Sequence, residues 1–385
     1  MAPTGISEGK LATRLAERTL ELVDVASESG AERDIAAHVL GVLRAGGVPA
    51  RDAGDTCVVA GATGRGGRPF VLLAGHLDTV PAQGNLPGRR DEEGVMGLGA
   101  SDMKGGVAVM VELALALAGS ARDGSSEDGG SRERGAAGAR GIVDVGYVLF
   151  GREELPSSEA ALGPLLAREP GLGEADLAIV LEPTANVVQA GCLGNIDASW
   201  KFTGRAGHSA RPWLADNAID HAVGAIRELH AREPERETIE GLEYAQVASV
   251  TTLRAGVARN VIPGACTANV NFRYSPRLSA SQGERELRER CERHGALELL
   301  SNSPGAMPPR ANPLFARLLA ASGVAAQAKQ AWTPVAEFAA AEIEAVNFGP
   351  GDPAMAHRAD ERVAAEALRE CYEILGSFLC GGRCA

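Results

Sequence analysis

The sequence predicts an α/β protein, in which a mostly parallel sheet is flanked by helices and an α+β domain is inserted into the chain. Apolar, strand-like runs alternate with helical segments near both ends, whereas the middle shows runs of alternating apolar and polar residues. The length of 385 residues also exceeds what one ordinary core holds, so two domains are expected. We place one domain at residues 1–193 and 303–385, and the inserted one at 194–302.

The elements of the first domain follow in chain order. Apolar residues at helical spacing predict helix from about Lys10 to Leu43. Strands are predicted for "TCVVAGA" and "FVLLAG", and a helix buried on most sides for "VAVMVELALALAG", which has almost no polar face. Further strands are predicted for "IVDVGYVLFG", "DLAIVLEPT" and "EAVNFGPGDP". This alternation is typical of a parallel sheet that is covered on both faces.

The inserted domain is predicted from three alternating runs, "NIDASWKFTGRAG", "YAQVASVTTLRAG" and "ACTANVNFRYSP", which are typical of half-exposed antiparallel strands. Helices are predicted for "NAIDHAVGAIRELHAR" and "SQGERELRERCERHG". A separate tract from Ser120 to Gly141 is rich in glycine, serine, arginine and glutamate and has no periodicity. We interpret it as a solvated insertion without a catalytic role.

Composition excludes several classes of partner. The net charge of −12 argues against nucleic acid, because binding to a phosphate backbone needs a basic surface. No apolar stretch reaches the roughly 18 residues of a membrane span, and the N-terminus lacks the pattern of a signal peptide. Seven scattered cysteines, an odd number, fit a reducing compartment better than a disulfide framework. We therefore expect a cytoplasmic protein without a nucleic-acid or membrane partner.

The run "FVLLAG" is followed directly by His76 and, two residues later, by Asp78. Residues two apart on an extended chain point to the same side, so an imidazole and a carboxylate can meet just beyond this strand. An isolated His-x-Asp is most often a capped strand end. Its meaning therefore depends on the residues at the ends of the other strands.

Imidazoles and carboxylates also come directly after the other predicted strands and turns. In chain order the set comprises His76, Asp102, Glu153, Glu154, Glu182 and His357. Open α/β sheets bind ligands at the carboxyl ends of their strands, where these residues are expected. A single acid after a strand is ordinary, but two histidines and several carboxylates after different apolar runs are hard to explain by solvation.

The donor set of these residues indicates a metal site. Imidazole and carboxylate ligands without a nearby thiolate suit Zn²⁺, Co²⁺ or Mn²⁺. Five ligands exceed what one catalytic zinc takes, but they suit two metals about 3.5–4 Å apart that share a bridging carboxylate. Because Glu153 and Glu154 are adjacent, they cannot easily reach the same metal, so one can ligate while the other stays protonatable.

Seven motifs carry a family resemblance: "GHLDTVP", "GLGASDMKGG", "REE", "LEPT", "GRAGHSARP", "RNVIPGACTANVNFRYSP" and "GPGDPAMAHRADE". Together they resemble the di-zinc aminoacylase/carboxypeptidase family, and most closely the succinyl-diaminopimelate desuccinylases of the actinobacterial type. The resemblance implies a zinc-exopeptidase-like catalytic domain and an inserted lid that forms a homodimer. It further implies that one zinc is held by His76, Asp102 and Glu182, and the other by Asp102, Glu154 and His357.

The same resemblance implies hydrolysis of the amide of a small N-acyl amino acid. Glu153 would be the general base, which takes a proton from the attacking water and returns it to the departing amine. Asp78 would fix the tautomer of His76. His208, in the "GHSA" motif, would stabilise the oxyanion in the active site of the partner subunit.

Substrate-binding residues are implied as well. Asn260 and Arg273 match family positions that bind the acyl or carboxylate end, for which a guanidinium fork is suited. Gly349, in "FGPGDP", lies in a tight turn that can present main-chain amides to a substrate.

Two departures from the family pattern leave the acyl group open. Many desuccinylases have an arginine in the segment where this chain has Cys192 and Leu193, which cannot bind a carboxylate; Arg211 is our candidate replacement. Pro334 also stands where relatives usually have an aspartate, and proline removes both a carboxylate and a main-chain donor.

The leading hypothesis is an enzyme that removes succinate from N-succinyl-L,L-2,6-diaminopimelate in lysine and diaminopimelate biosynthesis. Within enzymes, the alternative is an acetylornithine deacetylase, or a general N-acyl-amino-acid amidohydrolase or dipeptidase. A remote alternative is a non-catalytic binding protein on the same scaffold, which would require a lost ligand or base.

Overall fold

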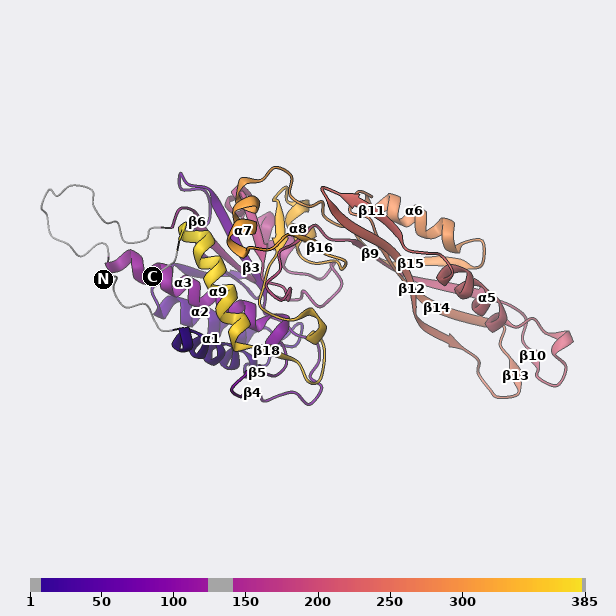
Figure 1. Ribbon diagram of the computed structural model, residues 1–385. Helices are drawn as coiled ribbons and strands as arrows, with labels where there is room; N and C mark the ends of the chain where they lie inside the picture. The colour runs from indigo at the N-terminus through magenta and orange to yellow at the C-terminus, as the bar shows by residue number, and fades with distance from the viewer. Residues whose placement is uncertain (1–7, 124–140, 383–385) are drawn as a thin grey trace, which may run out of the picture. The chain divides into compact units, whose positions relative to one another are not determined.

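The computed structural model describes residues 8–123 and 141–382, which form two compact units (Figure 1). Unit 1 comprises the described parts of Met1–Ala190, Pro309–Gln327 and Glu337–Ala385. Unit 2 comprises Gly191–Pro308 and Ala328–Ala336. Residues 124–140 of the predicted polar insertion lie outside the described residues.

An eight-stranded sheet in the order β1-β2-β6-β3-β7-β17-β8-β16 forms the centre of unit 1. Its strands are β1 (Ala50–Gly54), β2 (Cys57–Gly61), β3 (Phe70–His76), β6 (Asp144–Phe150), β7 (Leu177–Val180), β8 (Gln189–Ala190), β16 (Gln327–Ala328) and β17 (Ala345–Asn347). Strands β6, β3, β7 and β17 are parallel to one another, while β1, β2 and β8 pair antiparallel. The predicted α/β class with a mostly parallel central sheet is confirmed. Every residue of β3 and β7 is buried, so both faces of the sheet are covered there.

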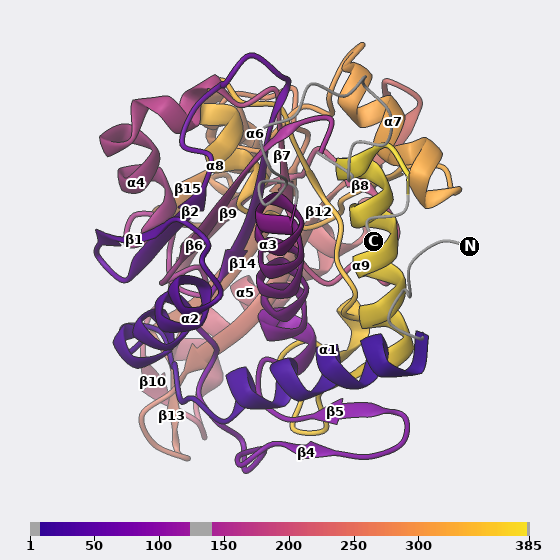
Figure 2. The same cartoon turned by 90° about the vertical axis from the view of Figure 1, so that its left-hand side faces the viewer.

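The helices of unit 1 are α1 (Glu8–Val23), α2 (Arg33–Ala45), α3 (Gly105–Asp123), α4 (Leu162–Arg168), α7 (Pro313–Ser322), α8 (Val335–Ala340) and α9 (Ala365–Cys380). Helices α1, α3 and α9 contact one another (Figure 2), and the first half of α3 is buried, as its sequence predicts. Among the helices of the described residues, none combines the length and the hydropathy needed to cross a bilayer.

The predicted helix from Lys10 to Leu43 is wrong in one respect, because two helices with a break between them occupy this segment. Gly30 has a left-handed backbone (φ 91°), which a helix does not allow. The break also bonds to the chain after β3: the amide of Ser29 donates to the carbonyl of Thr79 (3.1 Å), and the amide of Thr79 donates to that of Ser27 (2.9 Å). Tertiary bonds beside the end of β3 thus replace the helical ones.

A small antiparallel sheet joins two distant segments of unit 1. It consists of β4 (Arg89–Arg90), β5 (Gly94–Met96) and β18 (Arg362–Ala364), in the order β18-β5-β4. The sequence did not reveal it, because strands of two or three residues are too short for periodicity to show.

Unit 2 has a five-stranded antiparallel sheet in the order β11-β12-β14-β9-β15. The strands are β9 (Gly194–Thr203), β11 (Glu235–Ile239), β12 (Leu242–Ala255), β14 (Ala265–Tyr274) and β15 (Ala296–Ser303). Helices α5 (Ala218–His230) and α6 (Ala280–Cys291) pack on it side by side (Figure 1). Burial alternates along β9 and β14, as the sequence predicts. A separate pair, β10 (Gly207–His208) and β13 (Val261–Ile262), completes the unit.

One carboxyl in α8 gives a testable dependence of stability on pH. Burial raises the pKa of Glu337 from 4.5 to about 7, against a smaller opposite effect of the Gly163 amide. Between these two pH values the folded chain keeps a proton that the unfolded chain has lost, so folding stability falls as the pH rises, by about 3 kcal/mol at most.

Glu337→Gln removes this ionisation and keeps the hydrogen-bond acceptor. We expect the variant and the wild type to have similar unfolding temperatures at pH 5, and the variant to unfold at the higher temperature at pH 8. Thermal unfolding followed by circular dichroism at both pH values measures this, with the exposed Glu342→Gln as a matched control. A difference that does not change with pH would contradict the assignment.

Candidate metal centre

Three of the predicted polar segments come directly after adjacent parallel strands of unit 1. His76 is the last residue of β3, Glu153 and Glu154 lie just after β6, and Glu182 lies just after β7. Strand β3 pairs with both β6 and β7 in parallel, so all of these residues leave the sheet at its carboxyl edge.

The remaining two residues reach this edge from a turn and a long loop. Asp102 lies in the turn Ala100–Lys104 before α3, where its non-helical backbone (φ −122°) interrupts the helical path. His357 lies in the loop after β17, with a left-handed backbone (φ 61°). Gly351 allows this loop to approach the turn, because a Cβ there would lie 2.3 Å from the carbonyl oxygen of Ser101.

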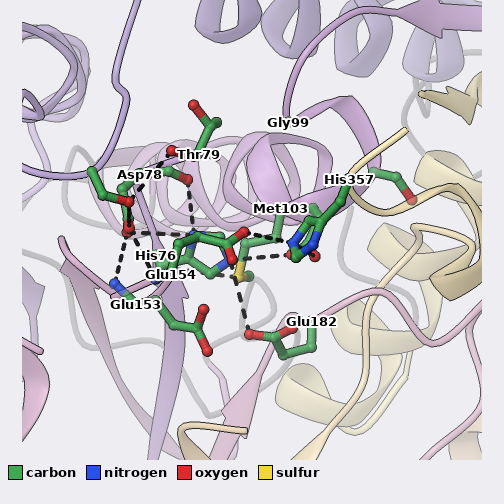
Figure 3. Close-up of polar contacts among 12 residues, drawn as sticks. His76, Asp78, Thr79, Gly99, Met103, Glu153, Glu154, Glu182 and His357 are labelled. Carbon is green, nitrogen blue, oxygen red and sulfur yellow. Dashed lines mark hydrogen bonds and ion pairs between the residues drawn. The ribbon is translucent and has the colours of Figure 1, made fainter. Parts of the chain in front are cut away.

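The first group of possible ligands is His76, Asp102 and Glu182. The Nε2 atom of His76 lies 3.1 Å from Oδ1 of Asp102 and 3.9 Å from Oε1 of Glu182. All three side chains are largely buried, and that of His76 is not exposed at all. Figure 3 shows His76 and Glu182 pointing toward one another.

The second group is Asp102, Glu154 and His357. The Nε2 atom of His357 lies 2.9 Å from Oε1 of Glu154 and 3.6 Å from Oδ2 of Asp102 (Figure 3 shows the histidine and Glu154). The two oxygens of Asp102 therefore face different histidines, one in each group. The side chain of His357 is 51% exposed, so this group is open to solvent.

The tautomer of His76 is set by the main chain of Asp78. Nδ1 of His76 lies 3.0 Å from the carbonyl oxygen of Asp78, and because a carbonyl can only accept, Nδ1 donates its hydrogen there. The lone pair of Nε2 is thus left to face Asp102 and Glu182. The carboxylate of Asp78 is 3.6 Å from Nδ1, beyond a hydrogen bond, so our expectation that this carboxylate orients the ring is corrected.

The Asp78 carboxylate instead holds the loop after β6. Its Oδ1 accepts from the amide of Glu153 (3.0 Å), and its Oδ2 accepts from the amide of Glu154 (3.1 Å) and the hydroxyl of Ser29 (2.8 Å). Glu32, fully buried, accepts from the amide of Arg152 in the same loop (3.1 Å). Sequence reasoning missed Ser29 and Glu32, because both lie in the segment where a continuous helix was expected.

Negative charge dominates the electrostatics of this edge. Burial raises the pKa of Glu153 well above its usual range, and the charge of Glu182 raises it further, although His76 opposes both. Burial lowers the pKa of His76, but the hydrogen bond with Asp102 and the neighbouring carboxylates outweigh it, so the pKa is raised. The bond from Glu154 raises the pKa of His357 to about 9. A field that draws protons to two imidazoles also attracts divalent cations, which compete with those protons.

The residues fit a pair of divalent metals on the chemistry of the donors. Four carboxylates share the site with two imidazoles, and such a cluster of buried like charges is costly without cations. Nitrogen and oxygen donors of this kind suit Zn²⁺, Co²⁺ or Mn²⁺. A carboxylate with one oxygen toward each group suits a bridging ligand.

Three predicted residues lie together in unit 2. His208 is in β10 and pairs with Val261 in β13. Next to it, the amide of Ser209 donates to the carbonyl of Asn260 (3.0 Å), and the amide of Arg211 donates to that of His208 (2.9 Å). Nδ1 of His208 accepts from the amide of Ala210 (3.1 Å), so Nε2 carries the hydrogen on an exposed ring.

Arg273 lies in β14 of unit 2 and is partly buried. Its Nε donates to Oδ1 of Asn271 (3.0 Å), and the amide nitrogen of Asn271 donates in turn to Asn195 (2.8 Å) and Asp197 (3.1 Å). Burial lowers the pKa of Arg273, with Asp197 acting in the opposite direction. This chain of bonds fixes the plane of the guanidinium group.

Gly349 does not have the role that we expected from its turn. Its amide donates to the hydroxyl of Thr184 (3.0 Å) and is therefore not available to a substrate. The position requires glycine for space, since a Cβ would lie 2.4 Å from the carbonyl oxygen of Leu181 and 2.5 Å from that of Glu182. Gly349 thus lets the loop pack on the segment that carries Glu182.

Known proteins resemble this chain over nearly its whole length. Residues 192–297 match the family model of a peptidase dimerisation domain. The chain is 37% identical over 369 residues to the putative succinyl-diaminopimelate desuccinylase DapE of Mycobacterium tuberculosis, which covers 95% of this chain and 98% of the relative. It is 33% identical over 370 residues to the succinyl-diaminopimelate desuccinylase of Corynebacterium glutamicum, with coverages of 94% and 95%.

Solved structures share the fold at low sequence identity. Aminopeptidase PepT from Bacillus cereus has a TM-score of 0.73 at 16% identity, over 96% of this chain and 98% of that one. The M20 family metallo-carboxypeptidase Sso-CP2 from Sulfolobus solfataricus has a TM-score of 0.72 at 15% identity, over 95% and 98%. At these identities the likeness concerns the fold alone.

Proposed function

The chain belongs to the family of succinyl-diaminopimelate desuccinylases, which are metal-dependent amide hydrolases, and we propose that it releases succinate from N-succinyl-L,L-2,6-diaminopimelate. The observation that carries the chemistry is the Asp102 carboxylate, whose two oxygens face His76 and His357 separately. The substrate is supported by relatives that carry this name over nearly their full length.

In this proposal the two groups of ligands hold two zinc ions, for which Co²⁺ or Mn²⁺ can substitute. His76, Asp102 and Glu182 hold one, and Asp102, Glu154 and His357 hold the other. When bound, the metals supply Lewis-acid chemistry, which polarises the amide carbonyl and makes water a better nucleophile at neutral pH.

Glu153 is the proposed general base. Its amide is held by Asp78, while its carboxyl remains within reach of His76 and Glu154 at the edge of the site. In the reaction it takes a proton from the attacking water and returns it to the departing amine nitrogen, so that it ends in its starting state. Burial suits a group that must hold a proton between these two steps.

His208 is the proposed donor to the oxyanion, and it acts in the active site of the partner subunit of a homodimer. The support is its exposed Nε2–H, which the Ala210 amide fixes as the donor. We expect His208→Ala to lower kcat by about 10²–10³-fold with little change in KM, because one oxyanion donor is lost. The exposed His221→Ala, in the same unit, is the control and should keep full activity.

Mixing two inactive variants tests whether His208 acts across subunits. Glu153→Gln and His208→Ala chains, dissociated and reassembled together, should recover about a quarter of the wild-type activity, because half of the dimers then contain one complete site. No recovery in mixed dimers would contradict the action across subunits, and full activity of His208→Ala alone would remove it from catalysis.

The proposed substrate-binding residues are Asn260, Arg211 and Arg273 in unit 2. Arg273 is supported by its fixed guanidinium plane, whose outer nitrogens can form a fork for a carboxylate. Arg211 and Asn260 are supported by their bonds to the His208 segment. The domain bounds, with unit 1 as the catalytic domain and residues 194–302 as the lid and dimerisation domain, belong to the same proposal, and so does a cytoplasmic location, which the free cysteines 57, 192, 266, 291 and 371 support.

A substrate panel tests the proposed reaction directly. Zinc-loaded protein is incubated with N-succinyl-L,L-2,6-diaminopimelate, N-acetylornithine and other N-acyl amino acids, and the released acid is measured. We expect the highest kcat/KM for the succinyl substrate. Turnover of N-acetylornithine alone would reject the substrate and keep the enzyme class, whereas no turnover by a metal-loaded chain would favour a binding protein.

A further inference from the structure

Glu361 is a buried carboxylate that neither the ligand groups nor the proposed base explains. It lies four residues after His357, and it is 2% exposed. It has no place in either group of possible ligands among the described residues. The buried ammonium of Lys104 interacts electrostatically with it.

The carboxylate of Glu361 binds the main chain of the turn that carries Asp102. Its Oε1 accepts from the amides of Ser101 and Asp102, and its Oε2 accepts from the amide of Gly99, each at 2.9 Å. One side chain therefore satisfies three amides around the bridging residue. A carboxylate can do this because both of its oxygens accept.

Other bonds fix Glu361 itself relative to this turn. The amide of Gly97 donates to its carbonyl oxygen (3.0 Å), and β18 begins at the next residue and pairs with β5. The hydroxyl of Ser101 donates to the carbonyl of Asp352 in the His357 loop (2.9 Å). The small sheet and these bonds thus join the segment that carries Asp102 to the loop that carries His357.

We propose that Glu361 is a positioning residue, which holds Asp102 and His357 at the spacing that a shared pair of metals requires. The inference rests on the proposed metal site. It assigns the three-stranded sheet β18-β5-β4 the task of bringing two ligand segments into register, 255 positions apart in the sequence (Asp102 and His357). Groups that orient metal ligands through hydrogen bonds change metal affinity by about 10–100-fold when they are replaced.

Glu361→Gln is the most direct test. An amide has one acceptor oxygen, and its NH₂ group would meet a main-chain N–H donor to donor, so either Gly99 or the Ser101–Asp102 pair loses its partner. The zinc affinity of the metal-stripped full chain is measured by competition with a chromophoric chelator. We expect it to fall by about 10–100-fold. Glu93→Gln, at a 77% exposed side chain in the same small sheet, should leave the affinity unchanged.

Two further measurements separate positioning from folding and from the metal proposal. Hydrogen exchange of the Gly99, Ser101 and Asp102 amides in the metal-free chain should accelerate in Glu361→Gln and not in Glu93→Gln. Glu361→Asp keeps both acceptors on a shorter stem, so it should recover part of the zinc affinity if Glu361→Gln folds poorly.

Zinc affinity of folded Glu361→Gln within about 2-fold of wild type, well below the expected loss, would overturn the inference. Zinc that fails to bind the wild type would instead reject the metal proposal. In that case the exchange rates of the three amides still decide whether Glu361 holds the turn.

Discussion

Replacing Glu153 with glutamine is expected to lower kcat by about 10²–10⁴-fold while the chain keeps its metals and its fold. Glutamine preserves the shape of the side chain and the amide bond to Asp78, but it cannot carry a proton between water and the leaving amine. The defect should lie in kcat rather than in KM, because the lost interaction belongs to the chemical step.

Metal analysis distinguishes this role from that of the adjacent glutamate. Glu154→Gln should lose metal, because Glu154 contacts His357 in the second group, whereas Glu153→Gln should retain it. The exposed Glu159→Gln, in the same loop, is the control for unspecific effects. Turnover within a few-fold of wild type in a metal-loaded Glu153→Gln would show that another group is the base.

Asp102→Asn is expected to have the largest effect on the metals themselves. Asp102 is the one side chain that belongs to both ligand groups, with Oδ1 near His76 and Oδ2 near His357. An amide supplies one neutral oxygen and cannot bridge, so metal content should fall from two ions to one or fewer per chain. Activity should fall by more than about 100-fold, the upper end of what even hydrogen-bonded neighbours of ligands cause.

The matched control for Asp102→Asn is Asp360→Asn. Asp360 lies in the loop of His357 but is 61% exposed and pairs with Arg358 at the surface. This variant should keep both metals and full activity. If Asp102→Asn kept two metals per chain after dialysis against a weak chelator, Asp102 would not be the bridge.

The sequence predicted the central part of the fold and the members of the site for a simple reason. Long apolar runs such as Phe70–His76 identify buried parallel strands, and polar residues after such strands must gather at one edge. The structure brings His76, Asp102, Glu154, Glu182 and His357 within reach of one another at that edge. Their roles as ligands remain proposals until metals are measured.

Contacts made through the main chain could not be predicted from the sequence. The carbonyl of Asp78 orients His76 and the amide of Gly349 bonds to Thr184, and neither bond depends on a side chain at the residue concerned. Glu361 closes the motif "GPGDPAMAHRADE", yet its role depends on strands of three residues, which leave no periodic signal.

The segment between α1 and α2 shows another limit of sequence patterns. Its apolar spacing continues the helical pattern, but hydrogen bonds between Ser27, Ser29 and Thr79 interrupt the helix beside the site. Tertiary bonds override local propensity there, and they bring Ser29 to the carboxylate of Asp78.

Anomalous diffraction at the zinc edge, from crystals of the full chain grown with zinc, tests the central claim most directly. We expect two peaks about 3.5–4 Å apart, one beside His76 and Glu182 and one beside Glu154 and His357, with the carboxylate of Asp102 between them. A single peak, or strong peaks away from these residues, would contradict a shared pair of metals at this edge of the sheet.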